Sequence, residues 1–471
     1  MATVTLTQTT TARQHYGLTF AVLALGGAAY ALLQSLVAPA LPTLHHDLHA
    51  SATSVTWVLT AYLLSASVCT PIFGRLGDMY GKERMLVIVL SVLAVGTVIS
   101  ALATSVEVMI AGRVVQGAGG AVFPLAFGII RDEFPPRLVA TGIALISAIL
   151  GIGAGAGIVL AGPIVDNLSY HWLFWLPLVA VVVADVAAVL FVPESPVKTP
   201  GRVNWISGFL LSAWLVCVLV AVSEGPTWGW GSPRTIGLFC AGGVLAGAWT
   251  RVESRSAEPL VDMRMMRLRG VWTVNVTAFL LGAGMYCSFV LIPQFVEAPS
   301  SAGYGFHASV TAAGLFLLPS TLGMLLISPL AGRLANAVGS KVPLVIGALL
   351  TSACFGLLAV TRSESFEIYV AAGLLGAGIG FAFAAMANLI VDAVPAEQTG
   401  VATGMNTVMR TIGGSVGAQI AATVLAAGAI GGIPSKHGFT VAFALAGGAV
   451  LVGFVSALAV PGRRPVRSPV R

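Results

Sequence analysis

The sequence predicts an all-α polytopic membrane protein, and its composition and apolar runs carry this prediction. The 471 residues are 57% hydrophobic and only 9% charged, which leaves too little polar surface for a water-soluble domain. Apolar runs of about 20 residues recur along the chain, the length that a helix needs to cross a bilayer. Short segments of alternating polarity, as in a membrane β-barrel, are not evident.

The predicted elements follow these apolar runs in order. Residues 1–16 are polar and rich in threonine, and we expect a tail there. The apolar run that follows is too long for the core of a signal peptide, so we expect it to be retained as the first span. The fourteen predicted spans cover residues 17–41, 54–73, 85–103, 107–130, 139–163, 171–192, 204–223, 234–250, 270–296, 309–331, 342–361, 367–391, 400–427 and 438–460.

The distribution of cations predicts the orientation. Most of the 24 Lys and Arg residues lie in every second connection, whereas the other face has only Arg234, Arg362 and Lys436. By the positive-inside rule we expect both termini in the cytoplasm and the chain in the lipid bilayer of the inner (plasma) membrane. Because the cations mark topology rather than one contiguous face, we expect no nucleic-acid partner.

The chain contains an internal repeat. The segment Gly74–Arg84, called the charged segment, is echoed by Gly332–Lys341, called the echo segment. Both begin with Gly-Arg-Leu, and each follows the second span of a six-span unit. Paired six-helix halves with a site between them are typical of transporters. The predicted domains are a cytoplasmic tail (1–16), a first half (17–192), an inserted hairpin with its cytoplasmic loops (193–269), a second half (270–460) and a basic cytoplasmic tail (461–471).

The charged segment separates apolar runs that end at Phe73 and resume at Met85. We expect a tight turn here, with glycines that let helix ends approach closely. A purely topological signal is one interpretation. The segment also resembles the pattern G-x-L-[AG]-D-x-x-G-[RK]-[RK] between helices 2 and 3 of major facilitator superfamily transporters, with Glu83 at the last basic position. This resemblance implies a cytoplasmic gate motif, in which Asp78 caps or pairs with a partner helix end. The motif consists of Gly74, Arg75, Asp78, Gly81, Lys82 and Arg84.

Further matches cover nearly the whole chain. Trp57–Tyr62, Arg113–Ala121 and Gly400–Asn406 are similar to segments of the fourteen-span drug:proton antiporter branch of this superfamily. The resemblance implies the major facilitator fold, with two six-helix halves plus an inserted two-helix hairpin, 14 spans in all.

Arg113 and Gln116 match the span-4 pattern R-x-x-Q-G-x-G of this family, a pattern that is associated with proton coupling. An arginine that snorkels from a helix end is the alternative. An unpaired arginine at mid-membrane costs about 2.5–3.5 kcal/mol on insertion scales. We therefore expect Arg113 to face a cavity or a partner.

Glycines in span 5 resemble the antiporter pattern G-x-x-x-G-P-x-x-G-G. The match implies antiporter-type helix packing at Gly153, Gly157, Gly162 and Pro163, although Ile158 takes the place of the family's first proline. Small residues at this spacing let two helices touch backbone to backbone.

A titrating carboxylate is harder to place. Leu33 occupies the position where the branch commonly has an aspartate. Asp185, well inside span 6, is a candidate for proton coupling, with structural pairing as the alternative. Glu224 and Glu297 lie near the outer ends of spans. They either take part in gating or are simply solvated at the membrane interface.

We expect the substrate cavity to be mostly apolar, because few charged side chains face it, and to suit amphipathic organic compounds. The polar and aromatic candidates for its wall are Gln34, Tyr62, Asn275, Tyr286, Gln294, Asn388, Asn406 and Arg410. His45 and His49 have a spacing found in metal sites, but a solvated loop is the simpler interpretation, and we predict no metal. Without a Walker pattern we expect no nucleotide and no other cofactor.

These observations predict a secondary active transporter that exports small amphipathic organic compounds, such as drugs or antibiotics, by proton antiport with alternating access. Its expected partners are a small-molecule substrate and protons, and we expect a monomer. A facilitator or importer of an organic solute on the same fold is the alternative, favoured by Leu33 and the altered span-5 pattern. An enzyme is not expected, because no inward-facing catalytic cluster is visible.

Overall fold

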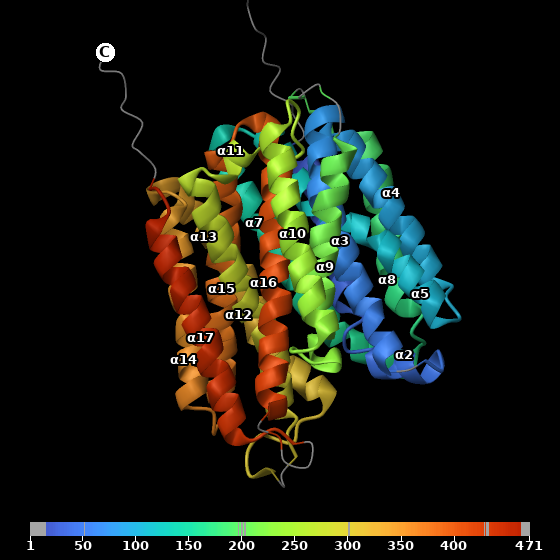
Figure 1. Ribbon diagram of the computed structural model, residues 1–471. Coiled ribbons are helices and arrows are strands. Elements are labelled where there is room, and N and C mark those ends of the chain that lie inside the picture. Colours follow the sequence, from blue (N-terminus) through green and yellow to red (C-terminus); the bar gives the residue numbers. More distant parts are fainter. Residues whose placement is uncertain are drawn as a thin grey trace, which may run out of the picture.

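The computed structural model confirms the all-helical architecture (Figure 1). It describes residues 16–50, 52–195, 197–198, 201, 204–299, 302–427, 429 and 433–462, and these residues form helices joined by loops. The predicted tails, residues 1–16 and 461–471, lie almost wholly outside the described residues. Their cytoplasmic placement stays a prediction.

The predicted spans of the first half each correspond to one helix, except that span 4 is divided. Its middle is a 3-10 turn of small residues, η1, between two α-helices. The elements are α1 (Tyr16–Ser35), α2 (Leu41–Asp47), α3 (Ala52–Tyr80), α4 (Lys82–Ala101), α5 (Val106–Gln116), η1 (Gly117–Ala121), α6 (Val122–Glu133), α7 (Pro136–Asn167) and α8 (Trp172–Phe191).

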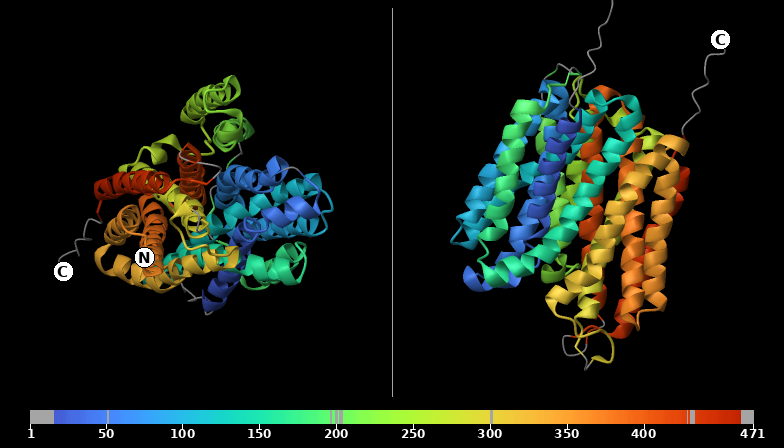
Figure 2. Two further views of the ribbon diagram at one scale, coloured as in Figure 1. Left: turned by 90° about the horizontal axis from the view of Figure 1, so that it is seen from below. Right: turned by 180° about the vertical axis from the view of Figure 1, so that it is seen from behind.

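The inserted hairpin and the second half follow. Seen along the bundle, the green hairpin pair stands at the edge, while the blue-to-teal and yellow-to-red halves form the body (Figure 2). The elements are α9 (Trp205–Trp228), α10 (Pro233–Arg255), α11 (Met263–Met266), α12 (Arg269–Val296), α13 (Val310–Val338), α14 (Lys341–Val360), α15 (Ser365–Ala393), η3 (Ala396–Gln398), α16 (Thr399–Ala427) and α17 (Lys436–Ala459).

Thirteen of the described helical segments are long and apolar enough to cross a membrane, so the chain is a multi-pass membrane protein. The fourteenth predicted span is α16, which has 29 residues but is rich in glycine and threonine and carries Asn406 and Arg410. It packs along α12 and α3, inside the bundle. Because protein rather than lipid covers it, low apolarity is tolerated there.

The first half and the second half meet mainly through α3 with α16 and α7 with α13, and α15 also packs against α7. Each of these two main pairs joins a second helix of one half to a fifth helix of the other, so the two contacts are related by the internal repeat. We call the end of the bundle that carries Arg75, Lys82, Arg84 and Arg131 the basic end. Helix α1 begins and α17 ends at this same end (Figures 1 and 2).

The charged segment differs from the prediction. We expected a tight turn after Phe73, but α3 continues to Tyr80 and only Gly81, with φ of 120°, breaks the helix before α4 begins at Lys82. The helix can continue because the charged side chains of Asp78 and Lys82 find buried partners within the protein, so they need no water.

Glycines set the closest helix contacts within the second half. A Cβ on Gly413 of α16 would lie 1.9 Å from the carbonyl oxygen of Phe279 of α12, and one on Gly417 would lie 2.3 Å from that of Ala283. Real Cβ atoms do not approach backbone this closely, so only glycine permits this packing.

We therefore expect Gly413→Ala to lower the yield of folded protein. Both helices belong to one half, so no alternative domain arrangement relieves the clash, and overpacking costs about 1–3 kcal/mol. Detergent extraction followed by size-exclusion chromatography measures the folded fraction. A wild-type profile would show that α12 and α16 separate more easily than this packing implies.

Candidate functional site

Asp78 joins the two halves at the basic end. Its side chain is completely buried, and its two carboxylate oxygens accept hydrogen bonds from the backbone N–H groups of Gly400 and Val401, each at 3.0 Å. These donors belong to the first turn of α16, where helical N–H groups have no partner within the helix. A carboxylate at this position is stabilised by two charge-assisted hydrogen bonds and by the helix dipole.

The backbones of α3 and α16 touch at the same point. A Cβ on Gly74 would lie 2.5 Å from the carbonyl oxygen of Gly400, and a Cβ on Gly400 would lie 2.4 Å from that of Gly74. This contact brings the first turn of α16 within reach of Asp78.

Lys82 is also completely buried, and it lies between two carboxylates. Its Nζ donates to Asp132 at 2.7 Å and lies 3.8 Å from Asp78. The Ser195 hydroxyl donates to the same carboxylate of Asp132. Two carboxylates around one ammonium keep these buried charges paired, which a membrane protein requires.

The other cations of the basic end are more exposed. Arg131, at the end of α6, donates to the carbonyl oxygens of Val394 and Pro395 and to the Thr399 hydroxyl, so it also bridges the halves. Arg84 pairs with Glu194 at 3.2 Å. Arg75 lies half-buried near Asp78.

The echo segment makes the corresponding contact on the other side of the molecule. Asn336, which aligns with Asp78, donates its amide N–H to the carbonyl oxygen of Arg137 and to the Thr141 hydroxyl at the start of α7. A Cβ on Gly332 would lie 2.9 Å from Cα of Thr141. The repeat therefore places corresponding side chains at both contacts, but Asn336 donates to a carbonyl oxygen and a hydroxyl, where Asp78 accepts from backbone N–H groups.

Arg113 lies in a completely buried position in α5. It donates to the carbonyl oxygens of Val58 and Leu33 and, at 2.7 Å, to the side-chain oxygen of Gln116. Gln116 in turn donates to the Thr97 hydroxyl. Within the described residues no carboxylate pairs with Arg113, and its Nη2 atom has no hydrogen-bond partner.

Tyrosine rings lie beside this arginine and at the contact between the halves. The Arg113 guanidinium lies 4.0 Å from the centre of the Tyr62 ring, and Tyr62 packs against Tyr30. Across the bundle axis, Gln34 of α1 donates to the hydroxyl of Tyr286 of α12 at 3.2 Å. The predicted residues Gln34, Tyr62 and Tyr286 therefore lie in the interior.

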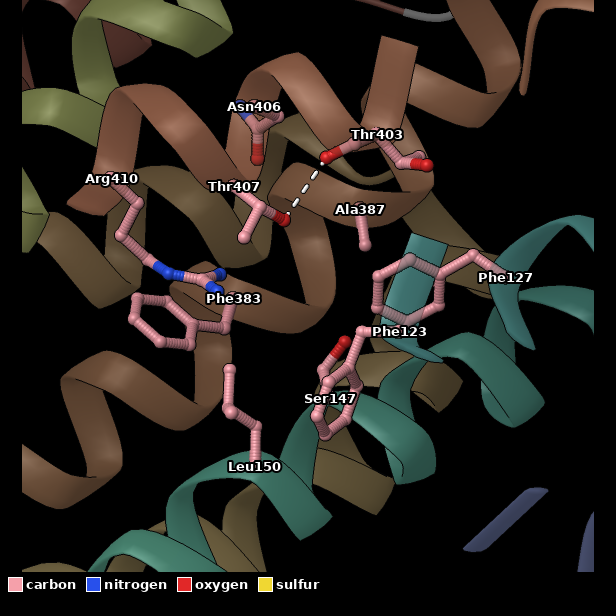
Figure 3. A pocket seen from close by; sticks show the side chains of 10 residues that line it. All are labelled: Phe123, Phe127, Ser147, Leu150, Phe383, Ala387, Thr403, Asn406, Thr407 and Arg410. Carbon is pink, nitrogen blue, oxygen red and sulfur yellow. Dashed lines mark hydrogen bonds between the residues drawn. The ribbon is translucent and has the colours of Figure 1, made fainter. Parts of the chain in front are cut away.

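A small cavity lies between the halves, towards the basic end (Figure 3). Its volume is about 10 Å³, room for about one water molecule, so no organic substrate fits in this closed arrangement. Helices α6, α7, α15 and α16 contribute to its wall. The lining residues are Phe123, Phe127, Ser147, Leu150, Phe383, Ala387, Thr403, Asn406, Thr407 and Arg410.

Of the predicted wall residues, Asn406 and Arg410 line this cavity. Asn275 lies one step behind, where its side-chain oxygen accepts a hydrogen bond from Asn406. Asn388 donates to the carbonyl oxygen of Ala140 of the other half. Gln294 is exposed near the end of α12, away from the cavity.

The glycine ladder of α7 divides between two neighbours. A Cβ on Gly153 or Gly157 would meet Ala31 or Ser35 of α1, at 2.3 and 1.9 Å. The intervening Gly155 faces Thr321 of α13 instead, across the boundary between the halves. Beyond the ladder, Gly162 is half-buried and Pro163 is exposed, and its carbonyl oxygen accepts a hydrogen bond from Asn167.

Asp185 lies on α8, where it accepts a hydrogen bond from the Ser91 hydroxyl of α4 at 2.7 Å. It contacts neither Arg113 nor the cavity. Glu224 and Glu297 are the two carboxylates predicted near outer span ends. Glu224 accepts a hydrogen bond from the Thr227 hydroxyl. Glu297 follows the end of α12, and burial raises its pKa.

We expect Asp185→Asn to retain transport within about twofold of the wild type, because an amide keeps the hydrogen bond to Ser91 and the site is peripheral. Substrate flux in reconstituted vesicles, measured over a range of pH, checks this. Loss of the proton dependence alone would identify Asp185 as the coupling acid.

Several residues of the site were missed from the sequence. Asp132 and Arg131 stand together at the end of span 4, and a charged pair at a span end is a signal that could have been followed. Ser195 and Thr399 carry no such signal, since single hydroxyl residues occur throughout the chain. The aromatic wall of Phe123, Phe127 and Phe383 is indistinguishable in sequence from lipid-facing or packing residues.

Comparison with known proteins identifies the family. A family model described as Major Facilitator Superfamily matches residues 23–418 and, in a second match, 274–471. The chain is 30% identical over 393 residues to "Tetracenomycin C resistance and export protein" of Streptomyces glaucescens, covering 82% of this chain and 71% of that protein. It is 29% identical over 381 residues to "Multidrug resistance protein 3" of Bacillus subtilis, covering 80% and 73%.

Solved structures share the fold. The human organic anion transporter MFSD10 (TETRAN) superposes with a TM-score of 0.67 at 16% identity, over 94% of this chain and 99% of that chain. The proton:xylose symporter XylE also gives a TM-score of 0.67, at 13% identity, over 95% and 96%. The architecture, the matching family model and the related export proteins show that the chain is a transporter, not an enzyme, and belongs to the major facilitator superfamily.

Proposed function

We propose that this transporter exports small amphipathic organic compounds, such as drugs or antibiotics, at the expense of the proton-motive force. Support for export comes from the related protein of Streptomyces, whose name describes resistance and export, and from that of Bacillus, whose name describes multidrug resistance. The observation that carries the mechanism is the closed basic end, where Asp78 holds the first turn of α16 beside the cavity.

In this proposal the protein lies in the plasma membrane and its basic end faces the cytoplasm, in accord with the positive-inside rule. The closed arrangement is then the one that denies cytoplasmic access. Opening towards the cytoplasm requires Asp78 to leave Gly400 and Val401, and Arg131 to leave Val394 and Thr399. The two halves would rock about the cavity between them, so that it is open to one side at a time.

The energy source in this proposal is proton entry, without any cofactor, and the functional unit is a monomer. Membrane potential contributes about 2.3 kcal/mol per charge per 100 mV, so one or two protons suffice for useful export. A coupling role for Arg113 is supported by its buried hydrogen bond to Gln116. The same guanidinium also donates to backbone carbonyl oxygens of α3 and α1, so it links three helices.

Inside-out membrane vesicles that contain the transporter test this function. A panel of aromatic dyes that includes fluorescein and rhodamine 123 is added outside, and respiration generates the proton gradient. We expect at least one dye to accumulate, and an uncoupler to abolish the accumulation. Accumulation that survives the uncoupler would contradict proton-driven export.

A facilitator or importer of an organic solute is the second candidate. One observation favours it: where the antiporter branch commonly has an aspartate, this chain has Leu33, whose backbone carbonyl accepts a hydrogen bond from Arg113. A facilitator would only equilibrate the dye across the vesicle membrane. Net accumulation against a gradient therefore separates the two candidates.

A further inference from the structure

Arg410 introduces a charge into the cavity without a counter-charge. Its side chain projects from α16 into the cavity, and its guanidinium lies 4.6 Å from the centre of the Phe383 ring (Figure 3). Among the described residues it has no hydrogen-bond or ion-pair partner for its guanidinium. The group is permanently charged and offers five N–H donors, so donors directed at the cavity are left for a ligand.

A second buried cation adds to the same field. Arg113 is bonded only to carbonyl and amide oxygens within the described chain, and its Nη2 atom is unpartnered. Tyr30 lies within electrostatic range of both arginines. The neighbourhood of Tyr30 therefore carries two guanidinium charges, one from each half of the molecule.

The carboxylates of the described helices do not balance these charges. Asp78 and Asp132 surround Lys82 at the basic end, and Asp185 is bonded to Ser91 at the periphery. A cation that is desolvated without a partner is unfavourable inside a membrane protein. An anion in the cavity would supply the missing partner.

The rest of the wall specifies what else the ligand carries. Phe123, Phe127 and Phe383 offer flat aromatic faces (Figure 3). The hydroxyls of Ser147 and Thr407 donate to carbonyl oxygens of their own helices. We infer that the transported compound is an aromatic organic anion. When the halves move apart and the cavity widens, its carboxylate or phenolate oxygen binds Arg410 and its ring packs against the phenylalanines. This inference rests on the proposed export function and names its substrate class.

Such a substrate also changes the energetics of export. An anion that leaves a cell with a negative interior moves in the direction that the membrane potential favours. The export of an anion therefore needs less help from a titrating membrane carboxylate than the export of a cation does. This agrees with Leu33 standing where the resemblance to the antiporter branch implies an acid.

Binding to the purified full-length protein tests the inference without any gradient. Fluorescein and rhodamine 123 share a fused aromatic ring system, but near neutral pH the first is an anion and the second a cation. Fluorescence anisotropy in detergent gives the affinity of each dye. We expect fluorescein to bind at least about tenfold more tightly, and Arg410→Gln to remove that preference.

Two variants make the test specific. Arg410→Lys retains a charge and should retain a preference for the anion, whereas Arg251→Gln removes an exposed cation of α10 and should leave both affinities unchanged. Equal binding of the two dyes, tighter binding of the cation, or a preference that survives Arg410→Gln would overturn the inference. If fluorescein binds with the expected preference but vesicles accumulate no dye of the panel, the anion site stands and the export proposal fails.

Discussion

Replacing Asp78 with Asn should reduce transport at least about tenfold while leaving the protein folded in the membrane. The amide has one acceptor oxygen for the two N–H groups of Gly400 and Val401, and it removes the negative charge at the start of α16. Hydrogen bonds to charged groups contribute about 1.5–3 kcal/mol, and a change of 1.4 kcal/mol alters a population tenfold. The ratio of the closed to the open basic end would therefore fall at least about tenfold. Flux in reconstituted vesicles measures the effect.

Asp262→Asn provides the matched control. Asp262 also accepts a backbone N–H at a helix start, that of Arg264 in α11, but it is part of a short connecting helix. We expect wild-type flux in this variant. Wild-type flux in Asp78→Asn as well would contradict a role for Asp78 in closing the basic end.

Gly74→Ala should abolish transport although alanine is a better helix former than glycine. The added Cβ would lie 2.5 Å from the carbonyl oxygen of Gly400 and 2.8 Å from its carbonyl carbon, and backbone atoms cannot yield as a flexible side chain can. Since Gly74 and Gly400 belong to different halves, the halves can separate at this end and the chain can stay folded. Flux and size-exclusion chromatography together measure this outcome.

Two substitutions calibrate this result. Gly243→Ala lies in α10, where an added Cβ would meet nothing within 4 Å, and it should transport normally. Gly413→Ala, which clashes within one half, should instead lose folded protein. If Gly74→Ala behaved like Gly413→Ala, the contact of α3 with α16 would be part of the fold rather than of a gate.

The spans and the pairing of the halves could be predicted from the sequence because they depend on apolar length and on repetition. The shared Gly-Arg-Leu start of the charged and echo segments placed Asp78 and Asn336 at corresponding positions. The structure then places both side chains at the first turns of fifth helices, α16 and α7. Local pattern sufficed here because the two contacts are related by the internal repeat.

The end of α3 could not be predicted, since hydropathy assumes that charged residues leave the membrane. Asp78 and Lys82 stay inside because each has a buried partner from another part of the chain, 322 residues away for Gly400 and 50 for Asp132. Such partners depend on tertiary packing. The same holds for Arg113, whose partners are mainly backbone carbonyl oxygens that any residue type provides.

The cavity was anticipated only in part. Asn406 and Arg410 were identified because polar residues in a span are uncommon, whereas Phe123, Phe127 and Phe383 were not, because aromatic residues in a span are ordinary. Gln294 illustrates the opposite case, a polar residue in a predicted span that lies exposed near the end of its helix. Position along the helix axis, which the sequence places only within a few residues, decides between these outcomes.

Access to the cavity from the basic end tests the gate most directly. Thr407→Cys, in a protein whose five native cysteines are replaced by serine or alanine, puts one thiol on the cavity wall. A membrane-impermeant maleimide is added to inside-out vesicles, where the proposed orientation exposes the basic end. We predict slow labelling with Asp78 intact and labelling at least about tenfold faster with Asp78→Asn. Equal rates in the two proteins would contradict the account, because the cavity would then be reached without passing the contact between Asp78 and α16.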